Sequence, residues 1–404
     1  MTSRVLAPLA SVVLFALTSG CASASEESTD RPSEIVVPPR PIASVPLAML
    51  RDGDSIYLAS AAQLDRIDAR TGELTHVAGP EWAACPREPR IVWMSTAFDF
   101  TYPSLTIRGT TAYLVHPDCG LWSFDFTTKK AQMLVDPSSD AKVAVAKATG
   151  HYAVGAIWNG KTGSDWSSPW GMAIASDGDG LVGCFPAFAT EPDADAPSAV
   201  GYRYRIELWS IATDGTPREL LAFIPRGRER EDGEDYCKQV IPEEDSLLVS
   251  TDKALLRWDR RTRQLTTIVG GFRHGADGVA TDATDIYFVK DNALVKVPRM
   301  GGPTVTLRAS SGTPDEPTRL LAALDGDFVY FNESYTLKRM RKDGRDLIDF
   351  ATGNSDDWVM PMVVGIGAEH IYFERITKAP PGTDPETGEQ YNPAFMGTMR
   401  RARK

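Results

Sequence analysis

The histidines of this chain are the first residues to consider for catalysis, because imidazole exchanges protons near neutral pH. Of the five histidines, His274 stands out, since the segment FRHGAD places Asp277 three residues further on. Arg319 occupies a similar place in the following repeat of the chain. These three side chains are the candidates for acid–base catalysis. A lone histidine in a loop is more often simply solvated, so the sequence leaves enzymatic activity uncertain and leans towards a non-enzymatic role.

Motifs that bind metals, nucleotides or cofactors do not occur in the sequence. There is no GxSxG, HExxH, P-loop or GxGxxG pattern. Three DGD segments, which begin at Asp52, Asp177 and Asp325, resemble fragments of calcium-binding loops. None of them continues into the twelve-residue ligand pattern that ends in glutamate, and Asp and Gly are also the residues that tight turns require. We therefore expect turns there, with no metal and no cofactor.

Short strands that recur along the chain must position the candidate residues. In the stretch 285–307, three apolar or alternating runs are separated by the turns Asp291-Asn292 and Gly301-Gly302. A leucine opens the third run of each unit, and an IYF-like run lies just before it. The leucines are Leu64, Leu121, Leu208, Leu255 (or Leu256), Leu294 and Leu337. A further apolar run upstream gives four strands per unit.

Four antiparallel strands per unit and a period near forty residues predict an all-β fold, a β-propeller. Counting the units predicts seven blades, although six or eight are also compatible. Blade three is the least regular, because its expected middle strands, HYAVGAIW and RIELWSIA, lie far apart. The last unit lacks a fourth strand, so we predict that the N-terminal segment around Ile35 to Val37 supplies it and closes the ring. The expected blade centres are Tyr57, Tyr113, Val154, Leu248, Tyr287, Tyr330 and Tyr372.

The IYF…LVKVPRMGG pattern resembles bacterial secreted propellers of the YWTD/NHL-like kind. In those proteins an aromatic pair ends the second strand, and a GG or DG turn joins the third and fourth. The resemblance covers roughly residues 45–404. It implies the fold and says little about function, because such propellers have many roles.

The first 20 residues resemble a bacterial lipoprotein signal peptide. Arg4 precedes an apolar run, residues 6–17, that is too short to span a bilayer. The tetrapeptide LTSG then leads to Cys21, the residue that such signals lipidate. An ordinary secretory signal followed by a coincidental cysteine is the alternative.

The residue after this cysteine bears on the destination of the protein. Ala22 is not the aspartate that retains such lipoproteins at the inner membrane, so the resemblance implies an anchor in the outer membrane. Residues 21–34 are expected to be a disordered tether, and residues 35–404 the propeller domain. The net charge of −11 argues against a nucleic-acid partner.

Antiparallel strands place all loops between strands two and three, and all connections between blades, on one face, which we call the insertion face. The opposite face, with the remaining hairpins, is the turn face. Four expected insertions fall on the insertion face: residues 79–100, 159–203 (between strands two and three of blade three), 226–236 and 377–394. Long loops commonly carry function, so this face is the candidate working surface.

Four cysteines remain besides Cys21, and an even number in an exported protein indicates two disulfides. Three pairings are possible. The expected topology groups Cys85 with Cys119 beside blade two, and Cys184 with Cys237 beside blade three, all on the insertion face. We therefore predict the disulfides Cys85–Cys119 and Cys184–Cys237.

Three tryptophans of the expected insertions, Trp82, Trp166 and Trp170, are candidates for binding, because exposed indoles stack on sugars and anchor protein partners. Packing beneath their own loops is the alternative. The leading hypothesis is an outer-membrane lipoprotein, periplasmic or surface-exposed, that binds or scaffolds an envelope protein or glycan. A lyase or hydrolase at the channel mouth is the second hypothesis, and a purely structural role is the third.

Overall fold

The fold consists of β-strands and turns throughout the part of the chain that the computed structural model describes. Those residues are 33–42, 48–59, 64–78, 105–116, 120–135, 152–154, 173–189, 204–224, 237–251, 253–272, 276–291, 293–309, 319–333, 335–353, 360–367, 369–378, 382–383, 390–391 and 395–404. Within these ranges no helix is long and apolar enough to cross a membrane.

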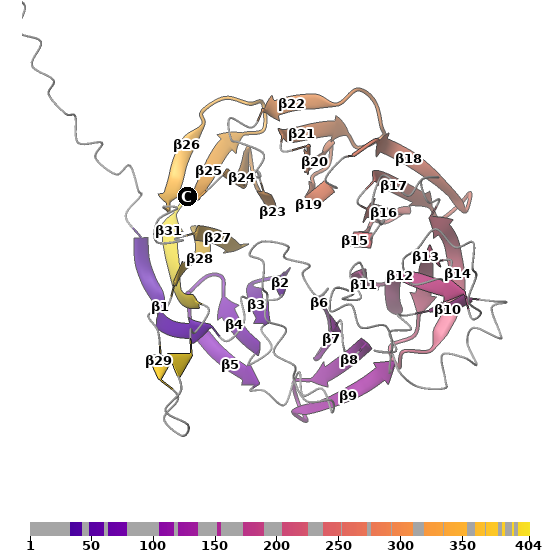
Figure 1. The fold of residues 1–404 in the computed structure, drawn as a ribbon, viewed down its shortest axis with the longest axis horizontal. Helices are drawn as coiled ribbons and strands as arrows, with labels where there is room; N and C mark the ends of the chain where they lie inside the picture. The colour runs from indigo at the N-terminus through magenta and orange to yellow at the C-terminus, as the bar shows by residue number, and fades with distance from the viewer. Residues whose placement is uncertain are drawn as a thin grey trace, which may run out of the picture.

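Seven sheets stand around a central axis, so the protein is a seven-bladed β-propeller, as the repeat predicts (Figure 1). Five blades each consist of four consecutive antiparallel strands that run outward from the centre. Blade 1 contains β2 (Ala48–Asp52), β3 (Ser55–Ala59), β4 (Leu64–Asp68) and β5 (Leu74–Ala78). Blade 2 contains β6 (Leu105–Arg108), β7 (Thr111–His116), β8 (Gly120–Asp125) and β9 (Lys130–Val135).

Blades 4, 5 and 6 follow the same plan. Blade 4 contains β15 (Cys237–Pro242), β16 (Ser246–Thr251), β17 (Ala254–Asp259) and β18 (Gln264–Gly270). Blade 5 contains β19 (Ala276–Thr281), β20 (Asp285–Lys290), β21 (Ala293–Pro298) and β22 (Val305–Arg308). Blade 6 contains β23 (Arg319–Asp325), β24 (Phe328–Glu333), β25 (Thr336–Arg341) and β26 (Ile348–Thr352).

Blade 3 corrects the predicted assignment of its middle strands. It contains β11 (Ala173–Asp177), β12 (Gly180–Ala189), β13 (Tyr204–Ile211) and β14 (Pro217–Ile224), and β10 (Tyr152–Val154) pairs with the far end of β12. The expected blade centre at Val154 is therefore wrong, because the second strand is the apolar run GLVGCFPAFA. The expected insertion 159–203 is also wrong. It contains β11 and β12, and only residues 190–203 separate the second and third strands.

Blade 7 combines the two ends of the chain. Its inner strands are β27 (Met360–Ile366), β28 (His370–Lys378) and β31 (Phe395–Arg403), and β1 (Ser33–Ile42) takes the outer position. β1 pairs antiparallel with β31 from Ser33 opposite Ala402 to Ile42 opposite Phe395. That this pairing keeps the ring closed stays a prediction. A small hairpin, β29 (Gly382–Thr383) with β30 (Gln390–Tyr391), lies between β28 and β31 in the sequence.

The hydrophobic core is divided among the seven junctions between neighbouring blades. Alternation along the middle strands explains this division, since successive side chains of a strand point to opposite faces. Ile286 and Phe288 of β20 pack towards blade 4, whereas Tyr287 and Val289 pack towards blade 6. The continuous apolar IYF-like runs are therefore strands that are buried on both faces.

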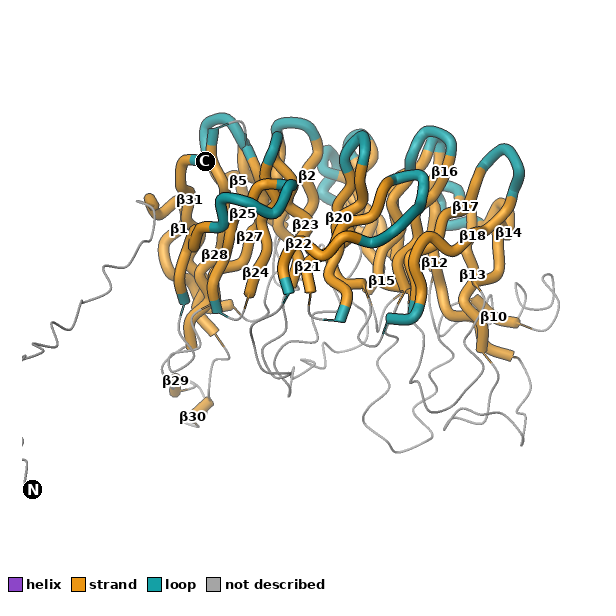
Figure 2. The backbone as a smooth tube through the Cα atoms, turned by 90° about the horizontal axis from the view of Figure 1, so that it is seen from above, coloured by secondary structure: helices purple, strands orange, loops and turns teal. Residues whose placement is uncertain are grey.

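The hairpins between strands one and two, and between strands three and four, lie together on the turn face (Figure 2). The strand ends from which the longer segments leave lie on the opposite, insertion face. Three of the expected insertions keep their predicted places in the strand order. They are 79–100 between blades 1 and 2, 226–236 between blades 3 and 4, and 377–394, whose first two residues end β28 and whose remainder lies between β28 and β31.

Candidate functional surfaces

Among the described strands, the ribbons formed by the second and third strands of two blades extend furthest at the insertion face. In blades 1, 2, 4, 5 and 6 the second and third strands pair over five or six residue pairs. In blade 3 the pairing runs from Leu181–Ile211 to Phe188–Tyr204, which is eight pairs. In blade 7 it runs from His370–Arg403 to Lys378–Phe395, which is nine pairs. Two or three extra residues extend a ribbon by about 7–10 Å.

A neighbouring strand continues along the extended part of each ribbon, namely the fifth strand β10 in blade 3 and the outer strand β1 in blade 7. β10 pairs with β12 at Ala187, Phe188 and Ala189, and β1 remains paired with β31 as far as Ile42 opposite Phe395. Blades 3 and 7 lie on opposite sides of the central axis (Figure 1). At the insertion face, the extended ribbons of these two blades therefore stand on opposite sides of the central axis.

The structure places Asp277 and Arg319 at corresponding ends of two neighbouring innermost strands. Asp277 is the second residue of β19 in blade 5, and Arg319 is the first residue of β23 in blade 6. Both strands begin at the insertion face and line the centre of the ring. His274 lies outside the described residues, so the predicted triad is located only in part.

The strand that carries Asp277 is bulged and held by a residue that the sequence alone did not single out. The register of β19 against β20 shifts between Asp277 and Ala280, and Gly278 adopts a positive φ of 56°. Gln239 of β15 compensates: the Val279 N–H donates to Gln239 Oε1 (2.9 Å), and Gln239 Nε2 donates to the Val279 carbonyl (3.2 Å). Bulges often re-aim side chains beside functional sites.

The remaining predicted site residues lie outside the described ranges. They are the binding candidates Trp82, Trp166 and Trp170, the lipidation candidate Cys21, and the cysteines Cys85 and Cys119. Among the described residues, no group of His, Cys, Asp or Glu side chains is arranged to hold a metal ion.

Cys184 and Cys237 form a disulfide, as predicted, with a Cα–Cα distance of 6.1 Å. Its position differs from the prediction. Cys184 lies within β12 and Cys237 begins β15, and both are buried in the core between blades 3 and 4. The disulfide therefore links two blades inside the ring and does not fasten a loop of the insertion face. The misassignment of β12 as part of an insertion caused this error.

A repeated ion pair joins neighbouring blades on the turn face. In blades 4 to 7 the residue directly after the third strand is basic, and it reaches the acidic residue at the end of the first strand of the preceding blade. We call each such pair a latch. The pairs are Arg260–Asp177 (2.6 Å), Arg299–Glu243 (2.9 Å), Lys342–Asp282 (2.7 Å) and Lys404–Asp325 (2.7 Å).

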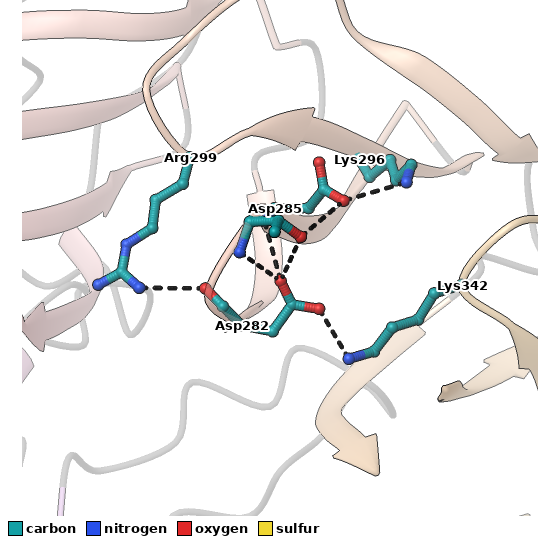
Figure 3. Close-up of polar contacts among 6 residues, drawn as sticks. Asp282, Asp285, Lys296, Arg299 and Lys342 are labelled. Atoms are coloured by element: carbon teal, nitrogen blue, oxygen red, sulfur yellow. Dashed lines mark hydrogen bonds and ion pairs between the residues drawn. The ribbon is translucent and has the colours of Figure 1, made fainter. Parts of the chain in front are cut away.

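The latch of blade 5 is the most elaborate (Figure 3). Asp282 Oδ1 accepts hydrogen bonds from the backbone N–H groups of Thr284 and Asp285 at 2.9 Å each, and its Oδ2 accepts a hydrogen bond from the Lys342 ammonium group. The Asp282 carbonyl accepts a hydrogen bond from Arg299 Nη1 (3.1 Å). The Asp282 carboxylate thus connects the first hairpin of blade 5 to blade 6. Its backbone carbonyl holds Arg299, the residue that forms the latch with blade 4.

These contacts shift the ionisation of the groups involved. Partial burial raises the pKa of Asp282, but the hydrogen bonds from Lys342 and from the backbone N–H groups outweigh it, so the pKa lies far below its ordinary value. Burial, followed by the nearby Asp282 and Asp285 carboxylates, raises the pKa of Tyr287. The ammonium groups of Lys296 and Lys342 lie 5.9 and 5.6 Å from the centre of the Tyr287 ring. This site consists of matched charges that hold two blades together.

Two of the three DGD segments take part in latches. Asp177 and Asp325, the first aspartates of their segments, pair with the basic residues of two latches. The second aspartate of each segment forms an ion pair within its own blade: Asp179 with Arg218 (2.6 Å) and Asp327 with Arg341 (3.0 Å). The central glycines, Gly53, Gly178 and Gly326, have φ values of 57°, 54° and 49°. The interpretation of these segments as turns is confirmed.

The sequence does contain a signal for the latches, but the signal spans two consecutive units. A charged residue directly follows the third strand in four consecutive units, and an acidic residue stands in the first hairpin of the unit before each. The signal is invisible within one unit, because the two partners of a latch belong to different blades.

The architecture defines the protein as a seven-bladed β-propeller with one latched face and one elaborated face. No protein-family model matches the chain, and no curated protein matches its sequence.

Several solved structures are similar in fold. A computationally designed protein, Ika8, is 11% identical over 94% of this chain and 98% of its own, with a TM-score of 0.45. BamB from Moraxella catarrhalis is 10% identical over 91% of this chain and 100% of its own, with a TM-score of 0.44. The AfRom2 CNH domain is 10% identical over 93% and 98%, also with a TM-score of 0.44. Likenesses this distant support no inference about function.

Proposed function

We propose that this protein is a binding or scaffolding propeller that holds an envelope protein or glycan on its insertion face. The observation that carries this proposal is the difference between the two faces. On the turn face, the described hairpins are short, and at four junctions their charges are paired in latches. On the insertion face, two extended ribbons stand on opposite sides of the channel mouth, and the longer segments leave from the strand ends there.

The binding test uses the corrected boundaries of blade 3. Removing residues 160–200 would delete β11 and β12, so the change must be confined to the segment between β10 and β11. The double substitution Trp166→Ala and Trp170→Ala changes no residue of a described strand. Crosslinking in native envelopes, followed by mapping of the crosslinked peptides, should place the partner on the insertion face, and the double variant should lose most of those crosslinks.

A matched control tests whether the loss is specific. Arg345 lies in the turn-face hairpin of blade 6, and its side chain is 79% exposed. Arg345→Ala should leave the crosslinks unchanged. Crosslinks that map to the turn face, or that survive the double tryptophan substitution undiminished, would contradict the proposal.

We further propose that the chain is attached to the outer membrane through a lipid on Cys21, after removal of residues 1–20. The support for this part is the resemblance of the N-terminal sequence to lipoprotein signals. Mass spectrometry of the N-terminal peptide from the producing cell should find an acylated Cys21. Cys21→Ser should move the protein from the membrane fraction to the soluble fraction. An unmodified N-terminus at another position would exclude the anchor.

Catalysis at the channel mouth is the second candidate function, as a lyase or hydrolase. The observation in its favour is that Asp277 and Arg319 stand at the same end of adjacent innermost strands, one of which is bulged at that point. Asp277→Asn should abolish turnover of envelope glycans measured by mass spectrometry of the products, whereas Arg345→Ala should not. Equal turnover by all three proteins would remove this candidate.

A further inference from the structure

Most of the exposed large hydrophobic side chains belong to one part of the ring. Among the described residues, five such side chains are exposed. Four of them, Ile35 (53%), Met300 (88%), Val305 (47%) and Leu347 (37%), lie in the consecutive blades 5, 6 and 7. The fifth, Phe223, lies near the insertion-face end of β14 in blade 3. We call the four grouped residues the apolar rim, because exposed apolar groups that gather in one place are typical of contact surfaces.

The apolar rim lies at the turn face. Met300 and Leu347 stand in the hairpins between the third and fourth strands of blades 5 and 6, which Figure 2 draws among the teal loops of that face. The other two residues lie near the starts of the outer strands β22 and β1, and both strands begin at the turn face. The rim continues across the junction of blades 5 and 6, since a Cβ atom at Gly344 would lie 3.7 Å from the Leu307 carbonyl oxygen.

The turn that carries Met300 does not need an apolar residue there. The turns 298–301 and 341–344 are each closed by a hydrogen bond of 2.8 Å from the fourth N–H to the first carbonyl. The second residue of each turn is the basic partner of a latch, and the third is exposed. That third residue is Met300 in blade 5 but Asp343 in blade 6, and Arg261 follows the latch residue of blade 4. The repeat therefore accepts polar residues at this place.

Leu347 is likewise replaceable within the repeat. The register pairs of blades 5 and 6 align it with the exposed Thr304. In the corresponding hairpins of blades 2, 3 and 4, every exposed residue is polar. These residues are 127–129, 214, 216 and 261–263. The apolar rim is thus a property of particular blades and not of the fold.

The chain enters the propeller at the same face. β1 begins at Ser33 opposite Ala402 and runs for ten residues to Ile42 at the insertion face. At about 3.3 Å per residue, about 30 Å separates its two ends. Residues 21–32 precede it and span at most about 40 Å when fully extended. A lipid on Cys21 would therefore hold the turn-face edge of blade 7 beside the bilayer, and only a nearly extended segment would let the insertion face reach it.

We propose that the apolar rim rests in the surface of the bilayer that carries the Cys21 anchor, so that the insertion face is directed away from the membrane. This inference rests on the anchor proposed above and adds the surface that contacts lipid. Charges beside the rim are paired, Arg345 with Asp343 and Arg341 with Asp327, so the contact is apolar. Exposed apolar side chains enter the boundary between headgroups and acyl chains, and an anchor makes even a weak contact of this kind effective.

Photo-crosslinking to lipid tests the contact. The mature chain is coupled through the Cys21 thiol to a maleimide lipid in phosphatidylethanolamine vesicles, and peptide mapping verifies Cys21 as the coupled residue. The vesicles also contain a phospholipid with a diazirine in its acyl chain. Because the coupling does not require acylation by the cell, a failure of the anchor proposal, read from the native N-terminal peptide, is distinguishable from a failure of this one.

Trypsin releases matched peptides for the comparison. Residues 300–308 contain two residues of the apolar rim, residues 291–296 contain part of the insertion-face hairpin of the same blade, and residues 264–273 contain the outer strand of blade 4. Lipid adducts on 300–308 should exceed those on each of the other two peptides at least about fivefold. Equal labelling of the three peptides, or strongest labelling of 291–296, would overturn the proposal.

The repeat supplies variants that keep the turns. Met300→Asp introduces the residue that blade 6 has at that place, and Leu347→Thr the one that blade 5 has. The double variant should keep its circular dichroism spectrum, and labelling of its 300–308 peptide should fall to the level of 264–273. Arg345→Ala, which removes an exposed charge, should keep the wild-type labelling.

Two further results would contradict the proposal. The first is undiminished labelling of a folded double variant. The second is a dimer that the wild-type chain forms without vesicles in light scattering and that the double variant does not form, because the apolar rim would then bind a second copy of the chain.

Discussion

Arg260 of blade 4 and Asp177 of blade 3 form a two-pronged ion pair, with Nη2 to Oδ1 at 2.6 Å and Nη1 to Oδ2 at 3.0 Å. The side chains are 31% and 21% exposed, so solvent screens the pair only in part. Paired planar groups of this kind are the strongest hydrogen-bonded ion pairs in proteins. Three further junctions have a latch at the same position, one formed by arginine and two by lysine.

Removing this latch should destabilise the ring. Arg260→Gln loses both prongs and leaves the partly buried Asp177 without its partner. We expect a loss of about 1–3 kcal/mol in the free energy of unfolding by urea, followed by circular dichroism. The neighbouring Arg261, which is exposed, provides the control, and Arg261→Gln should change stability by less than about 0.5 kcal/mol. Equal effects of both substitutions would show that the ion pair between Arg260 and Asp177 does not stabilise the ring.

The latch at Asp282 should make stability depend on acid. The pKa of Asp282 is lower in the folded protein than in the unfolded chain, so the unfolded chain binds the proton more readily as the pH falls. The stabilisation is complete above the unfolded pKa, near pH 4, and disappears as the pH falls through the folded pKa.

Comparison of the wild type with Asp282→Asn tests this sign. Urea midpoints measured between pH 2 and pH 7 should fall more steeply below about pH 4 for the wild type than for the variant. Glu244→Gln, at an exposed position of a turn in blade 4, should retain the wild-type profile. A variant profile parallel to that of the wild type would exclude Asp282 as the source.

The disulfide between blades 3 and 4 should contribute substantially to stability. It closes a loop across a sequence separation of 53 residues, for which the chain-entropy model gives about 4 kcal/mol. The double substitution Cys184→Ala and Cys237→Ala should lower the free energy of unfolding by this order. Peptide mapping without reduction checks the pairing, and it also tests Cys85–Cys119, which stays a prediction. A peptide that joins Cys85 to Cys184 would refute both.

Deletion of β1 tests whether the N-terminal strand keeps the ring closed. Without residues 33–42 the outer edge of β31 would lack its partner, and open strand edges promote association. We expect a less stable protein that forms concentration-dependent oligomers in light scattering. Deletion of residues 22–32 alone should have neither effect. A monomeric and equally stable deletion variant would show that the ring does not need β1.

The strands of blade 5 could be predicted from the sequence, whereas the second strand of blade 3 could not. In blade 5 the runs around Tyr287 and Leu294 are bounded by turn residues and contain a single register of apolar alternation, so their strands were predictable. In blade 3 two apolar segments, around Val154 and Val182, compete for the same position in the sheet. Local propensity does not decide between them, and the longer pairing of β12 with β13 does.

The sequence by itself determined the all-β class and the separation of the two faces, and it predicted seven blades and the Cys184–Cys237 pair. It did so because strand periodicity and turn residues act locally and repeat. Only the tertiary structure decided which blades are latched, where the ribbons are extended and which segment forms the second strand of blade 3. Those properties depend on pairs such as Lys342 and Asp282, which lie 60 residues apart in the chain and meet only when neighbouring blades pack.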